Sequence, residues 1–470
     1  LKKMVKSGDI YIEAKINFSD DGSISKDYVI DGDLENVKLR LLNKDSIENI
    51  KFGFILKNND YLVYNALSFY QGIKFRSDEI RIMEKDDAFL FNGNISTSKN
   101  DLNLKTISKI FQLDLKSIKN DKITFSSNNK FSFKLSKKYK FSDVKTNSKF
   151  NIESLEYPNS SLKRFFPGYK DGVKFENNVI NLDYQNGNYK ISGDSRFNIN
   201  EDIDSLSYSI ERAKDKIFFK TDFEVKSNAL NFELLNYTKK KDVKSGLIVE
   251  GVVNKNNSVL LNKINFAESK NFINIKNINL NSKKKLKRID QIDVYLVNNN
   301  DQISQLNIKR KKNNYSIKGK IFDGTKILDQ ILFSKSEANF FDIFEKLNSK
   351  ISINFDTIYI AKKEYLTNFK TDIIVFNNVI KDLILSSQFS TKEDLKLSIK
   401  TNSNNEKITD LFAGNAKPLV KKYDFIKGFD GGYLKFDSIE KNKVSNSNLK
   451  IFDFIGFKVK SFLQAYQTEE

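Results

Sequence analysis

The chain has 470 residues and a formal net charge of +19, and it contains no His, Cys or Trp. The lack of His and Cys excludes disulfides, thiolate or histidine nucleophile systems, and every zinc site built on those residues. With 39% hydrophobic residues, 3 Pro and 19 Gly, the composition also excludes a low-complexity linker and favours a folded chain over a disordered one.

The positive charge comes almost entirely from Lys. Lys and Arg together number 79 against 60 Asp and Glu, but Arg occurs only eight times. Arg is expected where phosphates or bases are gripped in a bidentate manner, so its scarcity argues against a nucleic-acid partner. We interpret the excess of Lys as a solubility feature that also attracts anionic lipid surfaces.

The dominant pattern along the chain is an alternation of apolar and polar residues, which predicts strands with one apolar face. In chain order, the alternation is clearest in residues 10–18, 50–56, 131–135, 217–225, 315–321, 351–359 and 395–399. Polar turn residues separate such segments, as at 58–60, 185–188 and 254–257. Strand, polar turn and strand in succession are typical of antiparallel sheets.

We therefore predict a mainly β fold, a long curled antiparallel β-sheet with a few short amphipathic helices, mostly towards the C-terminal half. Twist accumulates in an open sheet of roughly two dozen strands, and this makes the sheet curl. Residues 1–150 are expected to form the N-terminal portion of the sheet, and residues 151–470 are expected to continue it.

Helical spacing of apolar residues occurs in four places. These segments begin near Asp323, which is an N-cap candidate, near Phe340, at Pro418 and near Lys460. We expect each helix to close an end or an edge of the sheet.

Charged motifs offer few candidates for chemistry. The pairs Asp31–Asp33 and Asp202–Asp204 have the residue types for acid–base or calcium sites, but both are typical of turns. We therefore predict no catalytic, cofactor or metal site and no enzyme activity. Two basic runs, 239–241 and 283–288, are interpreted as solvated loops or blocked sheet edges, and alternatively as contacts for phospholipid head groups.

One segment near the C-terminal end carries a family resemblance. Residues 412–439 read FAGNAKPLVKKYDFIKGFDGGYLKFDSI, which resembles the C-terminal signature of AsmA-like proteins of the YhdP type. The matching positions are Asn415, Ala416, Leu419, Val420, Lys421, Gly431, Gly432 and Leu434. Asn415 stands for the usual Asp and Lys417 for the usual Gly, while Asp424 stands where Gly is common. Segments 206–225, 315–328 and 448–467 are similar to the family in the same order.

The resemblance implies a periplasmic β-groove protein that conducts phospholipid between the inner and outer membranes and supports envelope integrity. It also implies an N-terminal inner-membrane anchor, which this chain does not contain, and envelope protein partners at the ends. The chain contains no run of about 18 apolar residues that could span a bilayer as a helix. It begins at Leu1 without a Met and stops within a predicted helix at Glu470, so we expect it to be a fragment. Phospholipid acyl chains are the expected partner, with no nucleic acid and no cofactor.

The apolar sides of the clearest strands supply candidate groove-lining residues. They are Ile217, Phe219, Phe223, Val225, Ile317, Ile321, Ile351, Ile353, Phe355, Leu395, Leu397 and Ile399. A structural β-scaffold or adhesin with a closed core and no lipid cargo remains the main alternative, because a dry core also requires inward Ile, Leu and Phe. A carbohydrate-active β-protein is a further alternative, which the absence of Trp disfavours.

Overall fold

The computed structural model describes residues 5–25, 28–40, 45–111, 115–170, 172–199, 201–298, 301–327, 340–423, 426–427, 429–442, 444–455 and 458–459. The chain divides into two compact units, residues 1–228 (unit 1) and 229–470 (unit 2), which we describe separately. The division expected at residue 150 falls inside a strand, Phe141–Tyr157.

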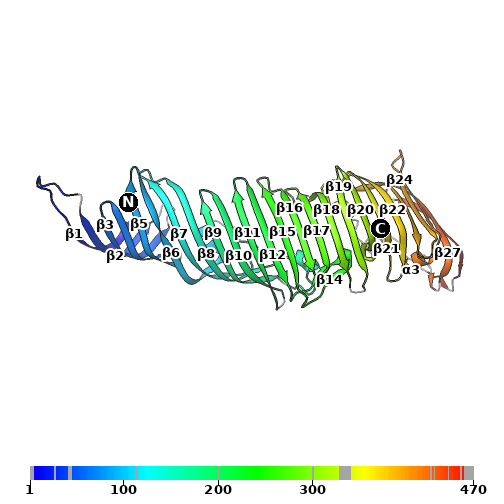
Figure 1. Ribbon diagram of the computed structural model, residues 1–470, viewed down its shortest axis with the longest axis horizontal. Helices are drawn as coiled ribbons and strands as arrows, with labels where there is room; N and C mark the ends of the chain where they lie inside the picture. Colours follow the sequence, from blue (N-terminus) through cyan, green and yellow to red (C-terminus); the bar gives the residue numbers. More distant parts are fainter. Residues whose placement is uncertain are drawn as a thin grey trace, which may run out of the picture. The chain divides into compact units, whose positions relative to one another are not determined.

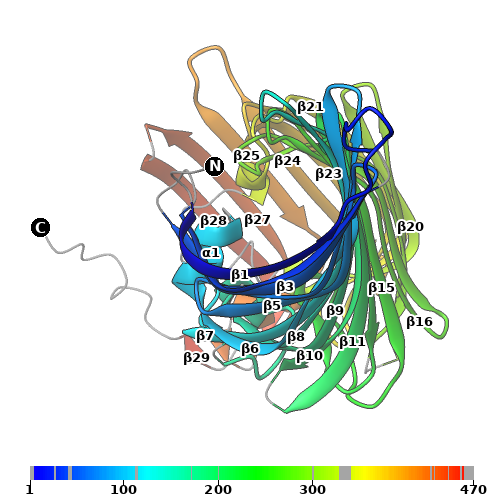
Figure 2. The same ribbon diagram turned by 90° about the vertical axis from the view of Figure 1, so that its left-hand side faces the viewer.

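Unit 1 is a meander in which each strand pairs antiparallel with the next along the chain. Its strands are β1 (Val5–Lys15), β2 (Val29–Arg40), β3 (Ser46–Lys57), β4 (Asp60–Tyr70), β5 (Ile73–Lys85), β6 (Ala88–Asn103), β7 (Lys122–Ser136), β8 (Phe141–Tyr157), β9 (Val173–Gln185), β10 (Asn188–Ile199), β11 (Asp202–Ala213) and β12 (Lys216–Val225). Figure 1 shows these strands side by side in chain order, and Figure 2 shows that they bend along their length.

Bulges interrupt several ladders of unit 1, and Asn residues make them possible. Asn36, Asn49, Asn65 and Asn177 have φ angles of 55°, 49°, 50° and 52°, close to the points where the pairing register shifts. Asn tolerates this left-handed conformation better than most residues, and a bulge bends and twists its strand. These positions therefore contribute to the curvature of the sheet.

Two helical segments lie on one rim of unit 1, at the connections that follow β6 and β8. They are α1 (Leu104–Phe111) and the 3-10 helix η1 (Ser160–Arg164). The connections on the opposite rim, such as Asn186–Gly187 between β9 and β10, carry no helix in the described part of the unit. We call this second rim the open rim of unit 1.

Unit 2 begins with a small hairpin, which is followed by thirteen longer sheet strands. The hairpin consists of β13 (Leu230–Phe232), the 3-10 helix η2 (Glu233–Leu235) and β14 (Tyr237–Lys239). The sheet strands are β15 (Ser245–Asn254), β16 (Val259–Glu268), β17 (Asn271–Leu280), β18 (Leu286–Val297), β19 (Ile303–Lys311), β20 (Asn314–Asp323), β21 (Ser349–Tyr359), β22 (Tyr365–Phe376), β23 (Val379–Phe389), β24 (Asp394–Thr401), β25 (Lys407–Ala413), β27 (Asp430–Lys441) and β28 (Val444–Ile455).

The pairing in the unit 2 sheet is antiparallel between successive strands except at one place, where β20 and β21 run parallel. The connection between them includes the 3-10 helix η3 (Phe340–Ile343). The remaining elements are α3 (Lys417–Tyr423) and a short pair formed by β26 (Ile426–Lys427) and β29 (Lys458–Val459).

The structure confirms a mainly β fold with long, curved, largely antiparallel sheet and few short helices. The seven strands predicted from alternation correspond to β1, β3, β7, β12, β20, β21 and β24. The helix at Pro418 is α3, whereas the segment at Phe340 forms only one 3-10 turn. Residues 328–339 and 460–470, which contain most of two other predicted helices, lie outside the described residues.

Candidate functional site

The apolar face of unit 2 can be traced residue by residue through its pairing register. Residues directly opposite one another in neighbouring strands point to the same face of a sheet. Ile308 on β19 pairs with Ile317 on β20, and Ile317 pairs with Ile353 on β21. The same row continues in both directions to the first and last strands of the sheet.

We call this line of side chains the central row. From β15 to β28 its members are Val249, Ile264, Ile275, Ile292, Ile308, Ile317, Ile353, Thr371, Leu385, Leu397, Leu411, Phe436 and Leu449. Thr371 is the single polar member. Thirteen strands therefore place one residue each on a continuous and almost entirely apolar line.

The central row is not covered as a core would be. Thr371 is buried, Leu449 is 49% exposed, and the other members are partly buried. Side chains in the closed core of a sheet packed on a second layer are mostly fully buried. The central row therefore remains accessible between two covered flanks.

The first flank is a cluster under η3. Phe341, Phe344 and Leu347 pack over Tyr315 and Ile351, with the rings of Tyr315 and Phe344 6.5 Å apart at an angle of 64°. Further members are Leu286, Ile373 and Val375, and Ile308, Ile317 and Ile353 of the central row contact its side. The connection between β20 and β21 thus covers one side of the apolar face.

The second flank is covered at one end by the hairpin of β13 and β14. Phe232 lies against Phe266 of β16 with a ring separation of 4.9 Å, and Tyr237 approaches the same ring at 6.1 Å. The Tyr237 hydroxyl donates a short hydrogen bond to Glu268 and accepts one from Asn271 at 3.2 Å. Burial, together with the bond to Glu268, raises the pKa of Tyr237 above its usual range.

A buried carboxylate fixes this hairpin to the sheet. Asp323, at the end of β20, is completely buried. Its Oδ2 accepts hydrogen bonds from Asn236 Nδ2 at 2.7 Å and Asn298 Nδ2 at 2.8 Å, and its Oδ1 accepts from the Thr325 hydroxyl at 2.6 Å. The Thr325 N–H also donates to Oδ1 at 3.1 Å, which is the cap contact predicted for Asp323. Lys239, predicted to be solvated, is instead completely buried at the end of β14.

The second flank is covered at its other end by α3, and here lie the residues that carry the family resemblance. Ala416, Val420 and Leu434 are buried together in one cluster, and Leu419 packs against it. The side chain of Asn415 accepts the Lys417 N–H at 3.1 Å, which caps the first turn of α3, whereas Lys421 is exposed.

Two glycines complete this match for reasons of space and backbone conformation. Gly431 and Gly432 have φ angles of 65° and 74°, and a Cβ on Gly432 would lie 2.4 Å from the carbonyl oxygen of Phe452. Gly is favoured at such positions because it has no Cβ to clash. The motif residues thus dock α3 onto β27.

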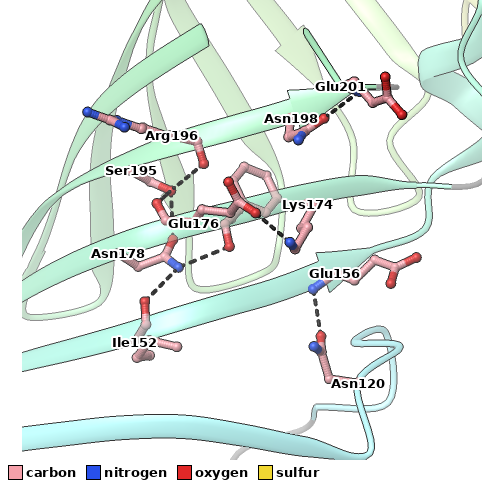
Figure 3. Close-up of polar contacts among 11 residues, drawn as sticks. Asn120, Ile152, Glu156, Lys174, Glu176, Asn178, Ser195, Arg196, Asn198 and Glu201 are labelled. Atoms are coloured by element: carbon pink, nitrogen blue, oxygen red, sulfur yellow. Dashed lines mark hydrogen bonds and ion pairs between the residues drawn. The ribbon is translucent and has the colours of Figure 1, made fainter. Parts of the chain in front are cut away.

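Unit 1 also has an apolar face, but this face includes buried polar side chains on several successive strands. Thr97, Ser127, Ser148, Asn178 and Ser195 are all buried on this face. Their bonds are mainly to one another and to backbone carbonyls. Asn178 Nδ2 donates to the Ile152 carbonyl at 3.1 Å, and the Ser195 hydroxyl donates to Asn178 Oδ1 at 2.6 Å (Figure 3). These contacts complete the backbone hydrogen bonding beside the Asn177 bulge.

The groove-lining candidates all lie on apolar faces. Ile317, Ile353 and Leu397 belong to the central row, and five others lie beside it on the same face: Ile321, Ile351, Phe355, Leu395 and Ile399. The other four, Ile217, Phe219, Phe223 and Val225, lie on the apolar face of unit 1, where Ile217, Phe219 and Phe223 pair with Arg212, Ile210 and Leu206.

Sequence reasoning missed most of the central row. Ile292, Ile308 and Leu411, for example, lie in strands whose alternation is interrupted by extra apolar or charged residues. Alternation shows that such residues share a face with their neighbours two positions away. The pairing between strands, which aligns them in one row, has no comparable signal in a single sequence.

The Asp31–Asp33 and Asp202–Asp204 pairs lie in strands, and Asp204 has a structural role. Asp31 and Asp33 lie within β2, not in a turn, and Asp202 lies at the start of β11. Asp204 is buried and accepts the backbone N–H groups of residues 226, 227 and 228 at 2.7–2.9 Å. In the described ranges, no group of three or more His, Cys, Asp or Glu side chains is arranged to hold a metal ion.

The opposite face of unit 2 is polar and contains a shallow hollow. Two rows of paired residues line it, one containing Asp293, Asn307, Lys318 and Asn354 and the other including the stacked rings of Phe272 and Tyr295. The carboxylate of Asp293 accepts hydrogen bonds from the side-chain amides of Gln291 and Asn307. This hollow is thus separated from the central row by the sheet itself.

Comparisons with known proteins provide no relative. No family model, curated protein or solved structure matches the chain. None of the helices in the described ranges has the length and apolar content needed to cross a bilayer. The AsmA-like resemblance is a hypothesis based on residues 412–439 and the three similar segments.

Proposed function

We propose that the apolar faces bind phospholipid acyl chains, and that the protein is a periplasmic β-groove that conducts phospholipid between the inner and outer membranes. The observation that carries this proposal is the central row. It joins every strand of the unit 2 sheet, is apolar at every position except Thr371, and is only partly buried. An anchor in the inner membrane and envelope partners at the ends belong to the same proposal through the AsmA-like resemblance.

The energetics of the central row suit an acyl chain. Covering apolar surface stabilises a complex by about 25 cal/mol per Å², or about 0.8 kcal/mol for each CH₂ group. Ile, Leu and Val offer similar contacts along the row, so a bound chain gains about as much at one strand as at the next. A guest held in this way can slide without crossing a large barrier.

The length of the central row is also suited to conduction of acyl chains. Neighbouring strands lie about 4.8 Å apart, so thirteen strands extend the row to about 60 Å. One acyl chain spans about half of the ~30 Å hydrocarbon core of a bilayer. The row is therefore several acyl chains long, as a conducting surface requires.

A site-specific crosslinking pair tests the proposal. Leu385 belongs to the central row, whereas Ile384, its neighbour on β23, lies on the opposite face and is 58% exposed. With a photoreactive side chain at each position in turn, we expect crosslinks to phospholipid from Leu385 and not from Ile384. Ile384 is a stringent control because its side chain is more exposed than that of Leu385, so nonspecific contact with lipid would favour crosslinks from Ile384.

Native mass spectrometry of the purified chain gives a second measurement. We expect co-purifying phospholipid on the native protein. A lipid-free protein together with no crosslink at Leu385 would reject the proposal and favour the structural scaffold.

A further inference from the structure

The turn between β7 and β8 exposes aromatic side chains at the open rim of unit 1. Tyr139 is 69% exposed and Phe141 is 67% exposed. Lys137, Lys138 and Lys140 surround them in the sequence, and all three are exposed. Lys137 forms an ion pair with Glu84 of β5 at 3.2 Å, which leaves Lys138 and Lys140 as the cations of the tip. Two large aromatic rings in water are unfavourable unless another surface covers them.

The backbone holds this arrangement in place despite an unfavourable conformation. Tyr139 has a φ of 57°, in a region that bulky side chains rarely adopt. The Tyr139 N–H donates to the Ser136 carbonyl at 2.8 Å, and the Lys140 N–H donates to the Ser136 hydroxyl at 3.1 Å. Asn or Gly would adopt this conformation at lower cost, so the aromatic side chain at position 139 requires an explanation.

An aromatic path connects the tip with the apolar face. Phe141 lies 5.3 Å from Phe133, and Phe133 stacks on Phe91 at 4.5 Å with an interplanar angle of 13°. Phe91 and Phe133 are paired residues of β6 and β7 on the apolar face. Phe141 is thus the outer end of that face, and Tyr139 lies beside it in the turn.

We propose that this tip, residues 137–141, inserts into the surface of an anionic phospholipid bilayer. Tyr139 and Phe141 lie at the level of the head groups, where aromatic residues concentrate, and Lys138 and Lys140 contact lipid phosphates. A protein partner fits less well, because Lys is depleted in protein–protein interfaces. The inference goes beyond the proposed function, since it concerns a membrane contact in unit 1 and does not require the central row to carry lipid.

A tryptophan reporter tests insertion directly, because the chain contains no other Trp. In Tyr139→Trp, we expect a blue shift of the emission, and quenching by brominated acyl chains, on adding vesicles of equal phosphatidylglycerol and phosphatidylcholine. Phosphatidylcholine alone should produce a smaller shift. The matched control is Phe218→Trp, which lies near the same rim and is 43% exposed but has no neighbouring aromatic tip. Equal responses of the two reporters would overturn the proposal.

Loss of vesicle binding gives a second, independent measurement. In Tyr139→Asn/Phe141→Thr, we expect vesicle affinity in co-sedimentation to fall by at least about tenfold, because burial of even one large aromatic side chain contributes about that factor. Asn suits the positive φ at position 139 and Thr suits a strand, so the variant should fold. Phe218→Thr is the control, and the affinity of the native chain should fall with added salt. Unchanged affinity of the double variant would overturn the proposal, whatever lipid the native chain retains in mass spectrometry.

Discussion

At the scale of single residues, the apolar face of unit 1 depends on a few polar side chains that complete backbone hydrogen bonds. Asn178 and Ser195 do so beside a bulge, and Asp204 does so where the chain leaves β12. A buried backbone N–H or C=O group without a hydrogen-bond partner costs about 1–3 kcal/mol. These polar residues therefore stabilise the sheet at the points where they interrupt its apolar face.

Asp204 offers a sharp test of this role. In Asp204→Asn, an amide NH₂ replaces one of two oxygens that together accept three backbone N–H bonds and one from the Asn228 side chain. Because bonds to a charged acceptor contribute about 1.5–3 kcal/mol, we expect a loss of about 2 kcal/mol in the free energy of unfolding of this region. Hydrogen exchange of the amides of residues 226–228 measures it. The control is Asp222→Asn, on an exposed position of β12.

The effect of Asp204 depends on pH in a defined direction. Burial alone would raise the pKa of Asp204, but the bonds from Asn228 and from the N–H groups of residues 226–228 outweigh it and lower the pKa. The carboxylate therefore adds stability above its unfolded pKa of about 3.9, and this contribution disappears as the pH falls through the lower folded value. The gap between native chain and Asp204→Asn should be constant near neutral pH and close in acid. A gap that widens in acid would contradict this assignment.

At the scale of elements, α1 shows how one rim of unit 1 is covered. Asn103 Oδ1 accepts the Lys105 N–H at 2.8 Å and caps the helix. Ile107 is buried against Ile73, Leu102 and Ile123. A helix of eight residues is unstable alone, so α1 forms because this packing holds it.

Removal of the Ile107 side chain should loosen α1. We expect Ile107→Ala to lower the free energy of unfolding of unit 1 by about 2–4 kcal/mol, because a buried aliphatic group leaves a cavity. Thermal unfolding and hydrogen exchange at Leu102 and Ile123 measure the loss. Lys105→Ala, on the exposed side of the same helix, should have little effect. Equal effects of the two substitutions would mean that α1 is not held by its apolar side.

Elements of the fold differ in how far the sequence predicts them. Strands such as β12 could be predicted because an apolar residue at every second position has only one simple explanation. The helix α1 was not predicted, since its short apolar pattern follows a strand directly and becomes helical through contacts with Ile73 and Ile123, which are distant in the sequence. The central row was predicted only in part, because Ile308 and Ile353 are aligned by a parallel pairing between β20 and β21 that alternation cannot reveal.

At the scale of the whole molecule, the strands of each unit combine two different surfaces. The central row crosses every strand of the unit 2 sheet, and Lys318 and Asp293 lie on the opposite face. The net charge of +19 keeps such a chain soluble and attracts it to anionic surfaces. A lipid-conducting protein needs two surfaces, an accessible apolar face for the acyl chains and a polar face exposed to solvent.

Conduction along the central row predicts that a local block stops transfer without removing bound lipid. Leu385 and Leu397 are paired neighbours in the row on β23 and β24. In Leu385→Glu/Leu397→Glu, two carboxylates interrupt the apolar line, and an acyl chain would have to desolvate them to pass. We expect lipid transfer between donor and acceptor vesicles to fall about tenfold or more, since each desolvation costs more than 1.4 kcal/mol. Native mass spectrometry should still find phospholipid bound elsewhere on the faces.

The matched control is Ile384→Glu/Ser398→Glu, which places the same two charges at directly paired positions on the opposite face of the same two strands. The control should transfer lipid at the native rate, and both variants should melt within a few degrees of each other. If the row variant also transfers at the native rate while folded, lipid does not travel along the central row, and the row serves only to hold the sheet together. If both variants lose transfer equally, charge and not the apolar line governs the exchange with vesicles.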